Sequence, residues 1–255
     1  MNKAKQNYFI SKEINSSIKS KGKETKKERE IKKFRTPLKD RILPDYTKGE
    51  EIINTASHGI GAILGIAALV LCVVFSAIKG DVWAVVSSAI YGSSLVLLYT
   101  MSSVYHGLTN EFAKKVMQVV DHCTIYFLIA GSYTPIVLCA IRAVNPVVAW
   151  TLFGVVWGLA VVAATVTAID LKKFRVFSMI CYIGMGWSIV FAAKTVMEAV
   201  AEKGLLLLLV GGISYTVGAI LYGLGKKHRY MHSIFHIFVV AGSVLQFFCI
   251  FFYVL

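Results

Sequence analysis

Four short groups of polar residues interrupt otherwise apolar stretches of this sequence. They are Glu51-x-x-Asn54-x-x-x-His58, Ser102-x-x-x-His106, Asp121-His122 and His232-x-x-x-His236. In a helix, His232 and His236 are one turn apart, so their rings project from the same face about 6 Å apart along the axis. Two ligands of one metal ion can use this spacing. The pattern therefore indicates chemistry at a bound metal ion.

A third imidazole, that of His106, would complete the set of metal ligands. Three histidines and one open position are typical of a catalytic zinc site, because a structural site fills all four positions with protein atoms. Imidazole and carboxylate ligands suit zinc or another borderline metal. We expect His122 and His228, in contrast, to be hydrogen-bonded packing residues or interfacial side chains.

Two further side chains could take part in catalysis. Ser102 is one turn from His106 on the same helix face, so its hydroxyl can reach a substrate carbonyl or a metal-bound water. Asp121 could accept a proton from that water or orient it, and direct ligation of the metal is the second possibility. Cys123 is an unfavourable ligand, since two residues along a helix turn it about 200° away from Asp121.

Glu51, Asn54 and His58 share one face of the same predicted helix. We expect them to support the ligands or to anchor the helix rather than to bind the metal. Their individual roles stay open at this point.

The elements that position these groups are predicted to be membrane-spanning helices. Apolar residues make up 56% of the 255-residue chain, which is more than a soluble globule of this size can bury. About 20 apolar residues cross a bilayer as a helix, and these runs lack the alternation of barrel strands. We therefore predict an all-α, seven-transmembrane helix bundle, a multi-pass protein of the cell membrane. Seven runs without charge carry this prediction: 52–78, 82–110, 122–141, 143–169, 176–193, 204–225 and 230–255.

Small residues and a proline mark where these helices should pack or bend. Gly61 and Gly65 are four residues apart, as are Gly154 and Gly158, and such pairs let helix backbones approach closely. Pro135 should kink the third span.

The charge distribution predicts the orientation. The formal net charge is +13, but 15 of the 27 Lys and Arg residues fall within residues 1–50, so we do not infer nucleic-acid binding. We expect residues 1–49 to be a basic, disordered cytoplasmic tail and residues 50–255 to be the membrane domain. Alternate threading of seven spans places 23 Lys and Arg on the side of the tail and 4 on the other. The N-terminus should therefore be cytoplasmic and the C-terminus outside.

This orientation places all four polar groups at the cytoplasmic ends of their helices. It is the reverse of that of a G-protein-coupled receptor. Residues 230–255 also contain no Lys, so the last span cannot form the Schiff base of a retinal protein.

These motifs resemble the bacterial hemolysin III family. The resemblance rests on Ser102-Ser103-Val104-Tyr105-His106, Asp121 ahead of Ile129-Ala130-Gly131-Ser132-Tyr133-Thr134-Pro135, His232-Ser233-Ile234-Phe235-His236, and the segment from Glu51 to Gly59. That family belongs with the progestin and adipoQ receptors and the alkaline ceramidases in a superfamily of seven-span proteins proposed to be metal-dependent hydrolases. The likeness covers about residues 50–255.

The resemblance implies roles for five residues. His106, His232 and His236 would be the zinc ligands, Asp121 would hold or activate the metal-bound water, and Ser102 would support that water or the oxyanion. The expected function is zinc-dependent hydrolysis of a membrane lipid amide or ester at a cytoplasm-facing site. The alternatives are a pore-forming cytolysin and a receptor-like protein with structural zinc. The sequence does not identify the substrate or the oligomeric state.

Overall fold

The computed structural model of the protein describes residues 35–225 and 228–255, so most of the predicted basic tail lies outside the described residues. The described chain divides between Ile42 and Leu43. The part before this division contains one short 3₁₀-helix, η1 (Leu38–Asp40). The unit Leu43–Leu255 contains all the remaining helices of the described residues, and no strand occurs in these ranges.

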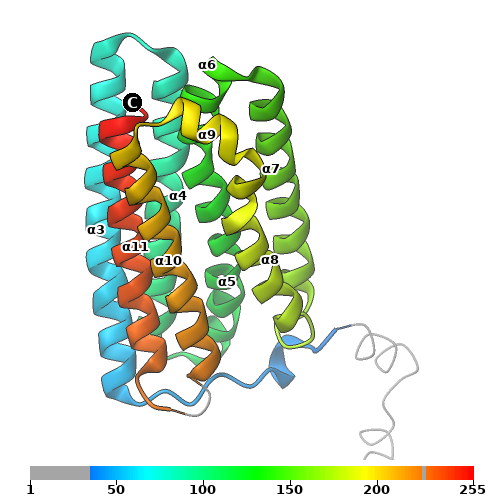
Figure 1. The fold of residues 1–255 in the computed structure, drawn as a ribbon. Coiled ribbons are helices and arrows are strands. Elements are labelled where there is room, and N and C mark those ends of the chain that lie inside the picture. Colours follow the sequence, from blue (N-terminus) through cyan, green and yellow to red (C-terminus); the bar gives the residue numbers. More distant parts are fainter. Residues whose placement is uncertain (1–34, 226–227) are drawn as a thin grey trace, which may run out of the picture. The chain divides into compact units, whose positions relative to one another are not determined.

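The second unit is a bundle of antiparallel helices (Figure 1). Within the described residues it contains seven stretches that are long and apolar enough to cross a bilayer, which confirms the predicted seven spans. The third stretch combines α5, η2 and α6, and the fifth combines α8, η3 and α9. The bounds are α3 (Lys48–Lys79), α4 (Val82–Gly107), α5 (Glu111–Pro135), η2 (Ile136–Ile141), α6 (Arg142–Val144), α7 (Pro146–Ile169), α8 (Arg175–Trp187), η3 (Ser188–Ala192), α9 (Ala193–Ala199), α10 (Glu202–Leu224) and α11 (Met231–Tyr253).

Local capping residues determine where several helices begin and end. Thr47 and Glu50 form a reciprocal capping box at the start of α3. Gly80 ends α3 with φ of 72°, a left-handed conformation that glycine adopts without strain. The side chains of Asp81 and Asn110 accept backbone N–H bonds at the starts of α4 and α5.

Two spans change helix type along their length. α5 ends at Pro135, where we expected a kink, and continues as the π-helical segment η2. α8 gives way to the 3₁₀ segment η3. The Tyr133 hydroxyl stabilises this second change, because it donates to Gly186 O (2.7 Å) and accepts from Ile189 N (2.9 Å).

The two glycine pairs behave differently. A Cβ on Gly61 would lie 2.6 Å from the Tyr99 ring, and one on Gly65 would lie 3.2 Å from Leu95 Cβ, so α3 and α4 approach closely as predicted. The same prediction was wrong for Gly154 and Gly158, which have no atom of the described structure within 4 Å of an added Cβ. Both positions lie on the outer face of α7.

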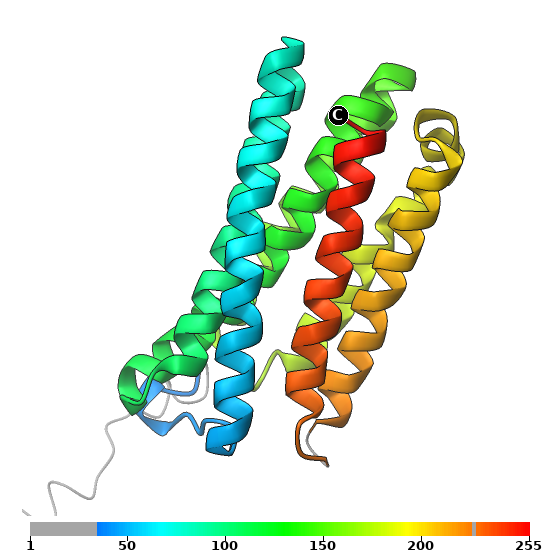
Figure 2. The ribbon, with the colours of Figure 1, turned by 90° about the vertical axis from the view of Figure 1, so that its left-hand side faces the viewer.

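The helix order brings the polar groups together. α11 runs between α3 and α10 in both views (Figure 1, Figure 2). The starts of α3, α5 and α11 and the end of α4 gather at the lower end of the bundle in Figure 1. We call this the histidine end, because His58, His106, His122 and His232 all belong to these helix ends.

Candidate metal centre

Three buried histidines from two helices point their rings at one another. His106 comes from the end of α4, and His232 and His236 come from the first turns of α11. Their exposed fractions are 2%, 8% and 1%. The Nε2 atom of His232 lies 3.2 Å from that of His106 and 3.1 Å from that of His236. One nitrogen from each ring lies within 4.8 Å of the others, so the group could hold a metal ion.

The hydrogen bonds of the opposite ring nitrogens support this assignment. Nδ1 of His106 lies 2.6 Å from Glu51 Oε2, and Nδ1 of His236 lies 3.3 Å from Asn54 O. Both partners are acceptors, so each Nδ1 carries the proton and each Nε2 presents a lone pair. Lone pairs that converge repel one another unless a cation lies between them. The ligating nitrogens of two imidazoles on a tetrahedral zinc ion are about 3.3 Å apart, close to the distances between the Nε2 atoms here.

Asn54 connects the three helices that surround the site. Its Oδ1 accepts a bond from Ser233 Oγ of α11 (2.7 Å), and its Nδ2 lies 3.4 Å from His106 Nδ1 of α4. Asn54 is completely buried, and its own carbonyl contacts His236. One residue of α3 therefore holds α11 at the depth of the histidines by two hydrogen bonds, and its amide nitrogen lies beside the ring of His106 on α4 without bonding to it.

Glu51 orients His106 and is itself held by a lysine. Its Oε1 forms an ion pair with Lys114 Nζ (2.7 Å), and its Oε2 accepts from His106 Nδ1. Lys114 also donates to the backbone carbonyls of His106 (3.2 Å) and Leu108 (3.1 Å). A carboxylate on the outer nitrogen of a ligating histidine fixes its ring and raises its basicity. The arrangement gives Glu51 a supporting position rather than a place among the ligands.

The segment before α3 covers the histidine group. The Tyr46 ring stacks on His232, with ring centroids 4.9 Å apart and an angle of 17° between the planes, and it also contacts His106 at 5.7 Å. Burial, followed by nearby acidic groups and Tyr222, raises the pKa of Tyr46 well above its usual range, so the ring stays neutral.

The loop before α11 anchors this segment. Arg229 donates to Asp45 O (2.6 Å), and Glu50 accepts from Tyr230 N (2.8 Å). Tyr230 has φ of 62°, a left-handed conformation that is unusual for a residue with a side chain. The turn is therefore held by its contacts with the start of α3.

Asp121 and Ser102, the predicted catalytic residues, line the same cavity as His232 and His236. Both are buried. The Asp121 carboxylate is not part of the three-histidine group, and its Oδ2 lies 3.6 Å from Nδ1 of His122. That nitrogen is 2.8 Å from Gln118 O, which agrees with a hydrogen-bonded packing role for His122. Cys123 points away, with its thiol 3.4 Å from Ala164 O of α7.

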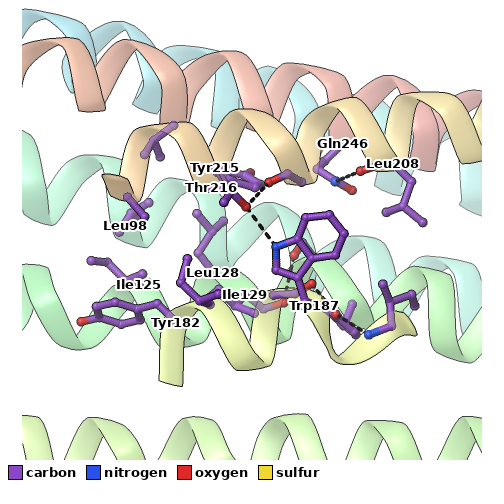
Figure 3. Close-up of a pocket in the computed structure, with 18 of the residues that line it drawn as sticks. Leu98, Ile125, Leu128, Ile129, Tyr182, Trp187, Leu208, Tyr215, Thr216 and Gln246 are labelled. Carbon is purple, nitrogen blue, oxygen red and sulfur yellow. Dashed lines mark hydrogen bonds between the residues drawn. The ribbon is translucent and has the colours of Figure 1, made fainter. Parts of the chain in front are cut away.

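The cavity is mainly apolar. Its volume is about 410 Å³, and α3, α4, α5, α8, α10 and α11 all contribute to its walls. Leu98, Ile125, Leu128 and Ile129 form part of the lining, together with polar side chains such as those of Tyr215, Thr216 and Gln246 (Figure 3). Trp187 Nε1, at the end of α8, donates to Thr216 Oγ1 of α10 (3.0 Å). This bond links α8 to α10 beside the cavity (Figure 3). A pocket of this size and lining fits an apolar chain with its polar end at the histidines.

Three contributors were missed or left open by the sequence. The helical spacing of Glu51, Asn54 and His58 indicated that Glu51 shares their face of α3. Its pairing with His106 could not be predicted, because it depends on how α3 packs against α4. Tyr46 and Lys114 gave no signal, because a loop tyrosine and a lysine near a helix start are common without a site. Only the assembled bundle places them at the histidines.

Comparison with known proteins adds a second line of observations. Residues 46–247 match the family model described as haemolysin-III related. The chain is 42% identical over 206 residues to Hemolysin-3 of Bacillus cereus, covering 81% of this chain and 92% of that protein. It is 39% identical over 208 residues to a Hemolysin-3 homolog of Bacillus subtilis (strain 168), covering 82% and 96%. The monocyte to macrophage differentiation factor of Homo sapiens is more distant, at 26% over 223 residues, with 85% and 88% covered.

Proposed function

Because the chain belongs to the haemolysin-III related family of multi-pass membrane proteins, we propose that it is a zinc-dependent hydrolase of a membrane lipid amide or ester. The observation that carries the proposal is the convergence of three histidine Nε2 atoms beside an apolar cavity. The cavity would accept the acyl chain of a lipid. The histidines would hold the ion near the bond to be cleaved.

The roles of the side chains follow from their positions. Bound zinc would lower the pKa of a coordinated water to about 7 and polarise the scissile carbonyl. Asp121 would take a proton from the attacking water as the new C–O bond forms, and would return it to the leaving nitrogen or oxygen as the old bond breaks. Ser102 would donate a hydrogen bond to the carbonyl oxygen as it gains negative charge. The products would be a fatty acid and an amine or alcohol.

We place the site at the cytoplasmic end of the bundle. Residues 1–50 and the links 106–118, 169–175 and 225–231 together carry 23 of the 27 Lys and Arg residues, which is typical of the cytoplasmic side. A lipid of the inner leaflet could then supply the substrate without leaving the membrane.

Metal analysis and lipid hydrolysis test the proposal together. The purified wild-type protein should contain about one zinc per chain and should release fatty acid from some members of a panel of lipid amides and esters. The His106→Ala/His232→Ala/His236→Ala protein should do neither. His228→Ala is the matched control, because His228 is exposed in the turn before α11 at the same end and lies outside the metal group. A zinc-replete wild type that cleaves no lipid of the panel would contradict the enzyme assignment.

Membrane lysis is the alternative outcome, since one relative is named Hemolysin-3 and another is named a Hemolysin-3 homolog. Reconstituted liposomes distinguish the two functions. Dye release that persists after loss of all three histidines would favour a pore, whereas dye retention with zinc-dependent lipid cleavage would favour the hydrolase.

A further inference from the structure

A fourth buried histidine at the site, His58, has no hydrogen-bond partner in the described structure. His58 is 3% exposed and lines the cavity, yet neither of its ring nitrogens has a hydrogen-bond partner in the described parts of the chain. It is also outside the group whose nitrogens lie within 4.8 Å of one another. Buried polar atoms are almost always paired, so an unpaired imidazole at a cavity wall points to a ligand.

The ring is held in one orientation by its neighbours. It stacks on His236 with centroids 3.6 Å apart and 11° between the planes, and it meets the Tyr99 ring edge-on at 5.0 Å. Tyr99 is fixed in turn, because its hydroxyl lies 2.6 Å from Ser243 Oγ and its ring packs against Gly61. The His58 nitrogens are therefore pre-oriented, and a ligand that meets them does not bear the entropy cost of ordering the ring.

The surroundings specify the chemistry of that ligand. A neutral imidazole offers one donor and one acceptor, which a hydroxyl group can match. The described lining contains Asp121 but no Lys or Arg, so no cationic side chain of the cavity can pair with a phosphate or another anionic headgroup. The rest of the wall is mainly apolar.

We propose that His58 binds the hydroxyl group of a neutral lipid in the cavity and so selects hydroxyl-bearing lipids over those without a hydroxyl. The proposal rests on the proposed lipid-binding function and adds the headgroup that the site recognises. It assigns His58 a role in specificity, distinct from that of the metal ligands.

Two ether lipids test this without being cleaved. 2-(Oleyloxy)ethanol and ethyl oleyl ether have the same chain and differ by one hydroxyl group. Their equilibrium binding to the full-length, zinc-loaded protein is measured with radiolabelled lipid. We expect the wild type to bind the hydroxyl-bearing ether roughly tenfold more tightly, the size of one hydrogen bond in a dry site.

His58→Phe keeps a stacking ring but removes both nitrogens, so it should bind the two ethers equally while its zinc content stays at the wild-type level. If the Phe variant does not fold, His58→Leu replaces it, and we expect the same equal binding of the two ethers. Ser132→Ala is the control, because Ser132 also lines the cavity but its hydroxyl already bonds Ile129 O (2.9 Å). It should keep the tenfold preference.

Four results would overturn the inference. Equal binding of both ethers by the wild type, or an unchanged preference in His58→Phe, would mean that His58 does not select the hydroxyl, and the proposed hydrolase would stand. Loss of zinc in His58→Phe would place His58 in the metal centre instead. If the wild type binds neither ether, the lipid-binding function fails and the inference fails with it.

Discussion

At the scale of single residues, the three histidines that could hold a metal ion differ in what contacts their outer nitrogen, the Nδ1 atom that faces away from the group. The outer nitrogen of His106 has a charged acceptor, Glu51, and that of His236 has a neutral carbonyl. The outer nitrogen of His232 has no partner in the described structure, and Tyr46 stacks on the ring instead. His106 should therefore be the strongest of the three ligands, because a carboxylate raises the basicity of its imidazole most.

Glu51→Gln tests this. Glutamine keeps the length and an acceptor oxygen but loses the negative charge, so we expect zinc affinity to fall by about 10–100-fold. Competition with a chromogenic chelator measures the affinity. Glu111→Gln is the control, because the exposed Glu111 forms its ion pair with Lys115 at the same end of the bundle and does not contact the three histidines in the described structure. Equal affinities of wild type and Glu51→Gln would show that Glu51 serves the packing of α3 rather than the ligand.

Asp121→Asn separates proton transfer from metal binding. Asparagine keeps the shape of the side chain but cannot accept the proton of the attacking water. Zinc should remain bound, since three histidines still hold it, whereas turnover should fall by about 10²–10⁴-fold. Zinc stoichiometry and lipid hydrolysis are measured on the same preparation. Loss of zinc from Asp121→Asn would make Asp121 a ligand and contradict the role proposed for it.

The sequence identified the candidate ligands because helical spacing is local. His232 and His236 had to share a face, and the charge-free runs placed His106 at the same depth. The contacts of Tyr46, His58 and Lys114 could not be predicted in the same way. They join segments up to 186 residues apart, from Tyr46 to His232, and depend on which helices are neighbours.

At the scale of helices, the two glycine pairs show how far a packing motif can be interpreted. Gly61 and Gly154 each stand four residues before another glycine, but only Gly61 meets a partner helix. The motif marks a face on which a backbone can approach closely, and the presence of a partner there depends on the whole bundle.

Gly61→Ala and Gly154→Ala form a matched pair. A methyl group at position 61 would meet the Tyr99 ring at 2.6 Å, and Tyr99 is buried and hydrogen-bonded, so it cannot move aside freely. We expect destabilisation of about 1–3 kcal/mol. The methyl group at position 154 meets nothing within 4 Å in the described structure, so Gly154→Ala should be close to neutral. Thermal unfolding in detergent measures both. Equal melting temperatures for the two variants would contradict the close approach of α3 and α4.

At the scale of the whole molecule, the three-histidine group joins helices that are distant in the sequence. α4 and α11 supply the histidines that could hold a metal ion, and α3 supplies Glu51 and Asn54, which contact them or their neighbours. The seven spans could be predicted from the lengths of the charge-free runs, because length and charge decide whether a helix can cross a bilayer. The order in which the helices pack could not, since apolar faces of similar composition do not specify their neighbours.

Zinc should therefore stabilise the bundle as a whole. A ligand that binds only the folded state adds about 2.7 kcal/mol when its free concentration is 100 times Kd. The melting temperature of wild type should rise with added zinc, and that of His232→Ala/His236→Ala should not. If added zinc left the melting temperature of the wild type unchanged, this result would contradict a zinc site shared between α4 and α11.

The orientation of the molecule decides which compartment supplies the water and receives the products. Because the predicted threading places 23 Lys and Arg residues on one side of the membrane and 4 on the other, inversion would carry most of the positive charge across the membrane. We expect reporter fusions to place the N-terminus and the loop at Arg229 in the cytoplasm, and the link at Lys79 outside. Replacing Lys172, Lys173 and Arg175 with Gln should leave this orientation unchanged, because most of the charge asymmetry is elsewhere. A cytoplasmic reporter signal at Lys79 would show that the bundle has the opposite orientation. The histidines would then lie at the outer surface, and the proposed substrate would be a lipid of the outer leaflet.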